Sequence, residues 1–291
     1  MASLAVNRAD ALRNEFAFLP YKPPNSLDTE EEITVKRTAH WSYCGPLLRP
    51  SPSDLDLPLP ANFYDFAAAT FTGPLLPRLL PFLEFVNEFM VASGLGHYLL
   101  TIRATTSTHE FDRPRWHTDE LFFSDLSPGN LPGTRLGLKS NNNRKRGSRG
   151  GFGTNWKICT TLLGPSTLFI PLEHQPSTRE TQRRAREAAS TDHVCLSIRC
   201  VGCASAADSV REDLATNLAE FDVKAAKLGE CALFRVGKES GAMHSEPCMS
   251  SSGRGRIFIN VVPGTEEELS GTMRKWGMEF PRQWWIGGYA V

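Results

Sequence analysis

The stretch Arg115-Trp116-His117-Thr118-Asp119-Glu120-Leu121-Phe122-Phe123 holds a histidine and an aspartate two positions apart. Side chains two apart on an extended chain point to the same side, so the imidazole of His117 and the carboxylate of Asp119 can meet one ion. A third ligand has to come from another segment. His244, which follows the apolar run Cys231-Ala232-Leu233-Phe234, is the candidate. The sequence therefore predicts a metal site with three protein ligands and open coordination positions.

A strand with a basic residue at its start follows His244. The polar, glycine-containing segment 250–255 indicates a turn, and residues 256–262 then alternate as a strand does. Arg256, Phe258 and Asn260 share one face of it. An arginine there can hold a carboxylate through two parallel hydrogen bonds, which lysine cannot. Arg254 has the same parity and competes for this role, but its flanking glycines indicate a turn, and we favour Arg256.

Two imidazoles and one carboxylate on one side of a metal are typical of non-haem Fe(II) oxygenases. With His117, Asp119, His244 and Arg256 in this order, the chain resembles the Fe(II)/2-oxoglutarate-dependent oxygenase superfamily, and it is similar in general to small fungal secondary-metabolism oxygenases. Residues 163–171 and 227–234 look like further strands of that family's core. The resemblance covers residues 98–263.

The resemblance implies a mainly β fold with flanking helices around a double-stranded β-helix of the jelly-roll or cupin-like kind. It implies Fe(II) as the metal, with 2-oxoglutarate as co-substrate and dioxygen as oxidant. Arg256 would hold the distal carboxylate of 2-oxoglutarate, with a hydroxyl hydrogen bond from Thr167. The implied activity is that of a dioxygenase that abstracts hydrogen from a C–H bond. Hydroxylation, desaturation or ring closure would follow, aziridine formation among them, on a small molecule such as an amino acid in secondary metabolism.

Two cationic and three aromatic side chains are candidates for contact with such a substrate. The cations suit a carboxylate and the aromatics suit an apolar side chain. Arg103 could instead form a salt bridge at a sheet edge, and Lys157 could face solvent near a strand end. The five candidates are Arg103, Lys157, Trp116, Phe122 and Phe258.

Two alternatives use the same sequence features differently. A cupin-like metalloprotein could share the three metal ligands without using 2-oxoglutarate, and it would form no succinate. A nucleic-acid-binding or nucleic-acid-acting protein would use the basic, glycine-rich loop 141–151, within the polar insertion 124–155. That insertion also suits a lid over the metal site. Aromatic residues are sparse around the loop, so nucleic acid is not the favoured partner.

Length and composition indicate one domain spanning residues 1–291, with 41% hydrophobic residues to form a core. We expect an N-terminal part of helices and loops (1–97), a β-helix core (98–263) with insertions at 124–155 and 174–226, and a tail (264–291). The formal net charge of zero favours neither nucleic acid nor an anionic membrane. The start of the chain lacks a signal-peptide pattern and no apolar run reaches membrane-spanning length. Seven cysteines without a repeating spacing indicate reduced thiols and a cytoplasmic protein.

Local patterns predict several individual elements. Apolar residues at helical spacing indicate a helix over 81–92, with Pro81 in its first turn, packed on the outside of a sheet. Strands are expected at 33–39, 98–105 and 156–163. Polar helices with solvated faces are expected at 178–189 and 206–221. In the strand 98–105, Leu100, Ile102 and Ala104 should face the helix, which leaves Arg103 on the opposite, inner face.

Overall fold

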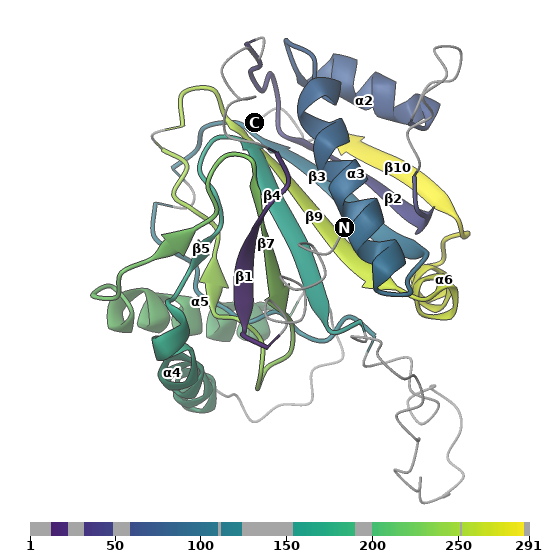
Figure 1. Ribbon diagram of the computed structural model, residues 1–291. Helices are drawn as coiled ribbons and strands as arrows, with labels where there is room; N and C mark the ends of the chain where they lie inside the picture. Colours follow the sequence, from purple (N-terminus) through teal and green to yellow (C-terminus); the bar gives the residue numbers. More distant parts are fainter. Residues whose placement is uncertain are drawn as a thin grey trace, which may run out of the picture.

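The computed structural model describes residues 13–22, 32–48, 59–109, 112–123, 154–189, 200–250 and 252–287. Within them, two antiparallel sheets form the framework (Figure 1). The large sheet has seven strands, in the order β1 (Phe16–Pro20), β7 (Glu230–Arg235), β4 (Trp156–Leu163), β9 (Arg256–Gly264), β3 (His97–Thr105), β2 (Ala39–Pro46) and β10 (Arg282–Gly287). The small sheet has the order β6 (Lys224–Ala225), β5 (Leu168–Phe169), β8 (His244–Ser245). The predicted mainly β fold with flanking helices is confirmed.

The chain passes repeatedly between the two sheets. After β3 in the large sheet, His117 pairs with β8 at the edge of the small sheet. The chain then forms β4 in the large sheet, β5 and β6 in the small one, β7 in the large one, β8 in the small one and β9 in the large one. Segments distant in sequence are therefore neighbours, and the two histidines of the predicted metal site lie on adjacent strands.

Helices cover the sheets on both sides (Figure 1). α2 (Ala61–Thr70) and α3 (Leu76–Ala92) lie over one face of the large sheet. α4 (Gln175–Ala188), preceded by the single 3-10 turn η3 (Leu172–His174), and α5 (Val201–Asn217) lie on the side of the small sheet. α6 (Glu266–Lys275) follows β9 and packs Leu269 and Met273 against β2, β3 and β9.

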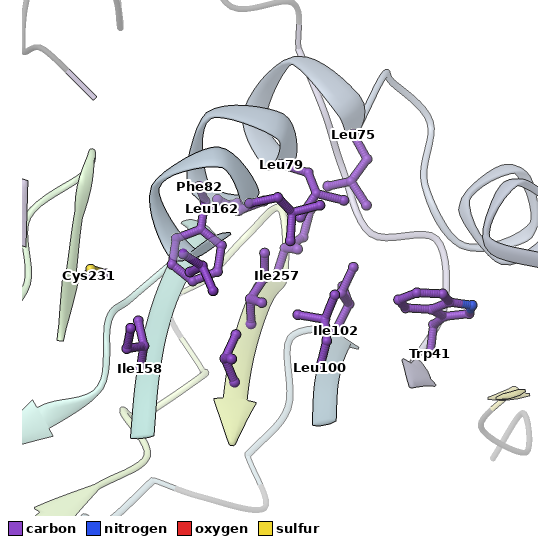
Figure 2. Packing of buried hydrophobic residues seen from close by; sticks show 14 of the residues in the cluster. Trp41, Leu75, Leu79, Phe82, Leu100, Ile102, Ile158, Leu162, Cys231 and Ile257 are labelled. Atoms are coloured by element: carbon purple, nitrogen blue, oxygen red, sulfur yellow. The ribbon is translucent and has the colours of Figure 1, made fainter. Parts of the chain in front are cut away.

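The main core lies between α3 and the large sheet. Leu79 and Phe82 of α3 are fully buried and point toward Ile102 of β3 and Ile257 of β9 (Figure 2). The predicted face of β3 therefore packs under a helix. The helix begins earlier than predicted, at Leu76, and Pro81 lies inside it, because another proline, Pro77, occupies the first turn.

The ends of the described chain contain more strand than we expected. The strand predicted at 33–39 is wrong in position, since the observed strand β2 begins only at Ala39. The N-terminal part, expected to be helices and loops, also supplies β1 and β2 to the large sheet, and the tail supplies α6 and β10. Both faces of β2 are covered, Trp41 toward the helices and Cys44 toward α6, so β2 lacks the simple alternation that marks a one-sided strand.

One sequence prediction concerns a segment that the structure does not describe. The basic loop 141–151, and with it residues 124–153 of the predicted insertion, lies outside the described residues. The lid and nucleic-acid interpretations of that loop remain predictions.

Among the described helices, none combines the length and the apolar character that a membrane crossing requires.

Replacing Phe82 with alanine should remove a fully buried ring from beneath α3 and leave a cavity there. We expect the free energy of unfolding to fall by about 3–5 kcal/mol, which urea denaturation followed by circular dichroism would measure. Val91→Ala, on the exposed side of the same helix, is the control and should change stability by less than about 0.5 kcal/mol. Equal effects of the two substitutions would contradict this packing.

Candidate metal centre

The three predicted metal ligands meet in the structure. One ligand atom from each of His117, Asp119 and His244 lies within 4.8 Å of the others. The two histidines pair through their backbones, with the His117 amide donating to the His244 carbonyl at 2.9 Å and the reverse bond at 3.0 Å. Their Nε2 atoms lie 3.8 and 3.7 Å from the two carboxylate oxygens of Asp119. One strand pairing thus brings together ligands from distant parts of the chain.

Hydrogen bonds orient both imidazole rings for ligation. The Nδ1 atom of His117 lies 2.7 Å from the Arg115 carbonyl oxygen, and that of His244 lies 2.9 Å from the Ala242 carbonyl oxygen. A carbonyl oxygen can only accept, so each Nδ1 carries a proton, and in the neutral ring the lone pair is on Nε2, which faces Asp119. This tautomer is the one that metal ligation through Nε2 requires.

The ligands also have the protonation states that a cation needs. Burial lowers the pKa of His244 to about 4, so its ring is neutral at pH 7. Burial by itself would raise the pKa of Asp119, but the neighbouring His244 side chain and the ammonium group of Lys157, which also donates a hydrogen bond, outweigh burial and hold this pKa below its ordinary value. A neutral imidazole and an ionised carboxylate are ready to bind a divalent metal without first losing protons.

Lys157 lies directly beside this centre. Its ammonium group donates to Asp119 Oδ2 at 2.7 Å and sits 5.1 Å from the centroid of the Phe122 ring. The residue is only 8% exposed, so it does not face solvent as one interpretation of the sequence suggested. The predicted substrate candidates Lys157 and Phe122 are therefore brought next to a metal ligand.

Arg256 forms a second buried cation on the same inner face of the large sheet. It is 4% exposed, donates from Nε to the Pro165 carbonyl at 2.9 Å and from Nη2 to Thr167 Oγ1 at 3.2 Å, and lies 4.4 Å from the Phe258 ring centroid. Burial lowers its pKa to about 10, which still leaves it charged at neutral pH. Among the described residues, no carboxylate forms an ion pair with this guanidinium. Such a cation is suited to an incoming anion.

Three other predicted residues are placed differently. Arg254 lies at the surface, with its guanidinium 3.9 Å from the carboxylate of Glu32, so only Arg256 joins the buried site. Arg103 is exposed but lies opposite Phe258 on the same inner face. Trp116 is buried against α5, in a cluster with Ile170, Leu214, Leu218 and Met243. Since it points away from its neighbour His117, its predicted contact with substrate needs correction: Trp116 is a core residue.

Two glutamines of α4 hold the segments that carry the histidines, and the sequence analysis missed both. Gln175 accepts a hydrogen bond from the Met243 amide at 2.7 Å and donates to the Ile170 carbonyl at 2.7 Å. With its amide oriented to satisfy both groups, Gln182 donates to Thr118 Oγ1 at 2.9 Å and accepts from the Thr118 amide at 3.1 Å. Both side chains are almost fully buried. Gln175 and Gln182 are two helical turns apart, so both lie on the same face of α4. This spacing was the one sign in the sequence that they could act together, although Gln175 lies before the helix predicted at 178–189.

Comparison with known proteins gives little further information. No protein-family model matches the chain, and no curated protein sequence matches it. One solved structure, described as "Crystal structure of non-heme iron oxygenase OrfP", aligns over 67% of this chain and 68% of that chain, with 12% identity and a TM-score of 0.26. A likeness this distant decides neither fold nor function, and the interpretation of the site depends on its own geometry.

Removing the Gln182 amide should loosen the His117–Asp119 segment and weaken metal binding. We expect Gln182→Leu to lower the affinity for Co(II) about 10- to 100-fold, measured by competition with a fluorescent chelator. Gln283→Leu, at an exposed position on β10, is the matched control and should bind Co(II) like the unmodified protein. Unchanged affinity in a folded Gln182→Leu protein would show that α4 does not position the ligands.

Proposed function

We propose that this protein is a non-haem Fe(II)- and 2-oxoglutarate-dependent oxygenase that acts on a small molecule. One observation carries the proposal: two imidazoles, each with Nδ1 held by a backbone carbonyl, converge with one carboxylate. This ligand set, with coordination positions left open, is the one that non-haem Fe(II) oxygenases use. The donor atoms fit Fe(II), since imidazole and carboxylate are both suitable ligands for it.

The proposed fold is a double-stranded β-helix. Its support is the alternate passage of the chain between the two sheets, from β3 through to β9, and the packing of Phe169 of the small sheet against Phe16 and Phe234 of the large sheet. In such a core the metal ligands lie on strands that face the opposite sheet. That places the metal centre inside the fold, where side chains from both sheets can shield it from water.

His117, Asp119 and His244 would hold Fe(II), and Arg256 with Thr167 would hold the distal carboxylate of 2-oxoglutarate. When bound, iron, 2-oxoglutarate and dioxygen together supply the oxidising chemistry. The contribution of the chain is then to bind and orient. The fixed imidazole tautomers keep both Nε2 atoms directed at the metal position, and the buried Arg256 supplies a charge-assisted, geometrically defined grip on a carboxylate.

The reaction class that we propose is oxidative tailoring, by hydroxylation, desaturation or ring closure, of a small molecule such as an amino acid. Two cationic side chains, Lys157 and Arg103, occur on the inner face and support a substrate that carries a carboxylate. A role in secondary metabolism, aziridine formation, the single-domain organisation and a cytoplasmic location stay predictions from the sequence.

Anaerobic addition of Fe(II) and 2-oxoglutarate to metal-free protein tests this function. We expect a weak visible charge-transfer band in the unmodified protein and none in His244→Ala, which lacks one ligand. Arg256→Ala should need at least about tenfold more 2-oxoglutarate to reach the same band, because a charge-assisted pair is lost. Arg254→Ala removes an arginine from the surface nearby and should leave the titration unchanged.

Two outcomes would contradict the proposal in different ways. Iron binding without a band, and without succinate formation in air, would exclude 2-oxoglutarate and favour a cupin-like metalloprotein with the same ligands. Failure of the protein to bind iron at all, with His244→Ala no different from the unmodified protein, would exclude the metal centre itself.

A further inference from the structure

A cavity of about 260 Å³ opens beside the metal centre, on the side of Lys157. One wall consists of Asp119, Glu120, Leu121, Phe122 and Lys157. Thr272, Lys275 and Trp276, from the last turn of α6 and the residue after it, line the other. None of these three residues was predicted from the sequence to belong to a site. The structure instead brings the end of α6 next to a metal ligand.

The cavity lies at the opposite end of the inner face from Arg256. In the antiparallel pair of β4 and β9, Ile158 is opposite Val261, so its neighbour Lys157 is level with the end of β9, whereas Arg256 begins that strand. Lys157 is level with Val262, so at about 3.3 Å per residue along a strand its backbone lies roughly 20 Å from that of Arg256. A co-substrate held by Arg256 would therefore leave Lys157 available to a different molecule.

The walls of this cavity combine a buried cation with aromatic surface, and the Glu120 carboxylate, which also lines it, is paired with Lys238 at 2.9 Å. The Lys157 ammonium has three N–H donors, and Asp119 accepts from one of them. A divalent ion bound to Asp119 would neutralise much of the negative charge that now attracts Lys157. An anion could then replace Asp119 as the partner of Lys157. Phe122 lies against the Lys157 ammonium, and Trp276 leaves 47% of its surface exposed at the cavity wall. Exposed aromatic surface beside a buried cation suits an amphipathic anion.

We propose that this cavity is the substrate site, and that it takes a small carboxylate with a short apolar body. Lys157 pairs with the carboxylate, and Phe122 and Trp276 contact the apolar part. The volume is slightly below the roughly 300–1,000 Å³ of pockets for drug-sized ligands, so the occupant is a smaller molecule. That this ligand is the substrate rests on the proposed oxygenase function; the preference for a carboxylate does not.

Binding of 4-methylpentanoate, with 4-methylpentan-1-ol as the neutral counterpart, tests the cavity. The protein is loaded with Mn(II) and saturated with 2-oxoglutarate, so that the Arg256 site is already filled. Calorimetry measures affinity, and broadening of the ligand methyl signals by Mn(II) shows whether the ligand lies beside the metal. We expect the carboxylate to bind with broadening and the alcohol to bind at least about tenfold more weakly.

Lys157→Met should weaken carboxylate binding at least about tenfold and leave alcohol binding unchanged, because only the charge-assisted bond is lost. Lys224→Met is the control: Lys224 is an exposed lysine of β6 in the small sheet and does not line this cavity. It should bind both probes as the unmodified protein does. Trp276→Ala, at a half-exposed position that tolerates truncation, should weaken both probes several-fold, and it decides the matter if Lys157→Met does not fold.

Equal affinity for carboxylate and alcohol, no carboxylate binding, or full carboxylate binding in Lys157→Met would overturn the proposal. So would weaker 2-oxoglutarate binding in Lys157→Met, since Lys157 would then serve the co-substrate. Manganese loading is measured separately, from the electron paramagnetic resonance signal of the Mn(II) that stays free in solution. A protein that does not load manganese contradicts the iron site, and its preference between the two probes in calorimetry still decides which ligand class the cavity takes.

Discussion

The pairing of His117 with His244 is the interaction on which the candidate site depends. Two backbone hydrogen bonds, at 2.9 and 3.0 Å, fix two segments side by side that come from opposite halves of the chain. The other contacts at the site orient the two histidines or hold the segments that carry them. The rings are oriented by carbonyl groups two residues before each histidine, and Gln175 and Gln182 of α4 hold the residues next to the ligands. A helix on the outer side of the small sheet thus supports the candidate metal centre on its inner side.

The two faces of the large sheet have different roles: one forms the main hydrophobic core, and the other carries the side chains of the candidate site. Toward α3 it presents side chains such as Leu100, Ile102 and Ile257, which are fully buried and account for the main core. Toward the small sheet it presents Lys157, Cys159, Arg256 and Phe258. Alternation along a strand allows one element to serve both purposes, because successive side chains point to opposite faces. Substitutions on the two faces should therefore affect different properties of the protein.

Charge on the inner face is costly for the folded protein. Arg256 and Lys157 are both almost fully buried, and removing a charged group from water costs free energy. Lys157 is compensated by Asp119, whereas Arg256 has only neutral acceptors among the described residues. Hydrophobic side chains of similar size would stabilise these positions more, so the cations are best explained by anions that bind there. The distance between them along the paired strands β4 and β9 supports two separate anions.

The sequence by itself determined the local features: the two-residue spacing of His117 and Asp119, the strand that begins at Arg256, and the helix whose apolar stripe includes Phe82. These depend on periodicity, which neighbouring residues carry. It did not determine that Trp116 faces α5, that Gln182 is buried, or that Lys157 pairs with Asp119. Nor did it show that β1 and β2 join the large sheet, or that α6 forms a wall beside the metal centre. Only the tertiary structure decided these, because each depends on contacts between segments far apart in the chain, and a single sequence carries no local pattern for them.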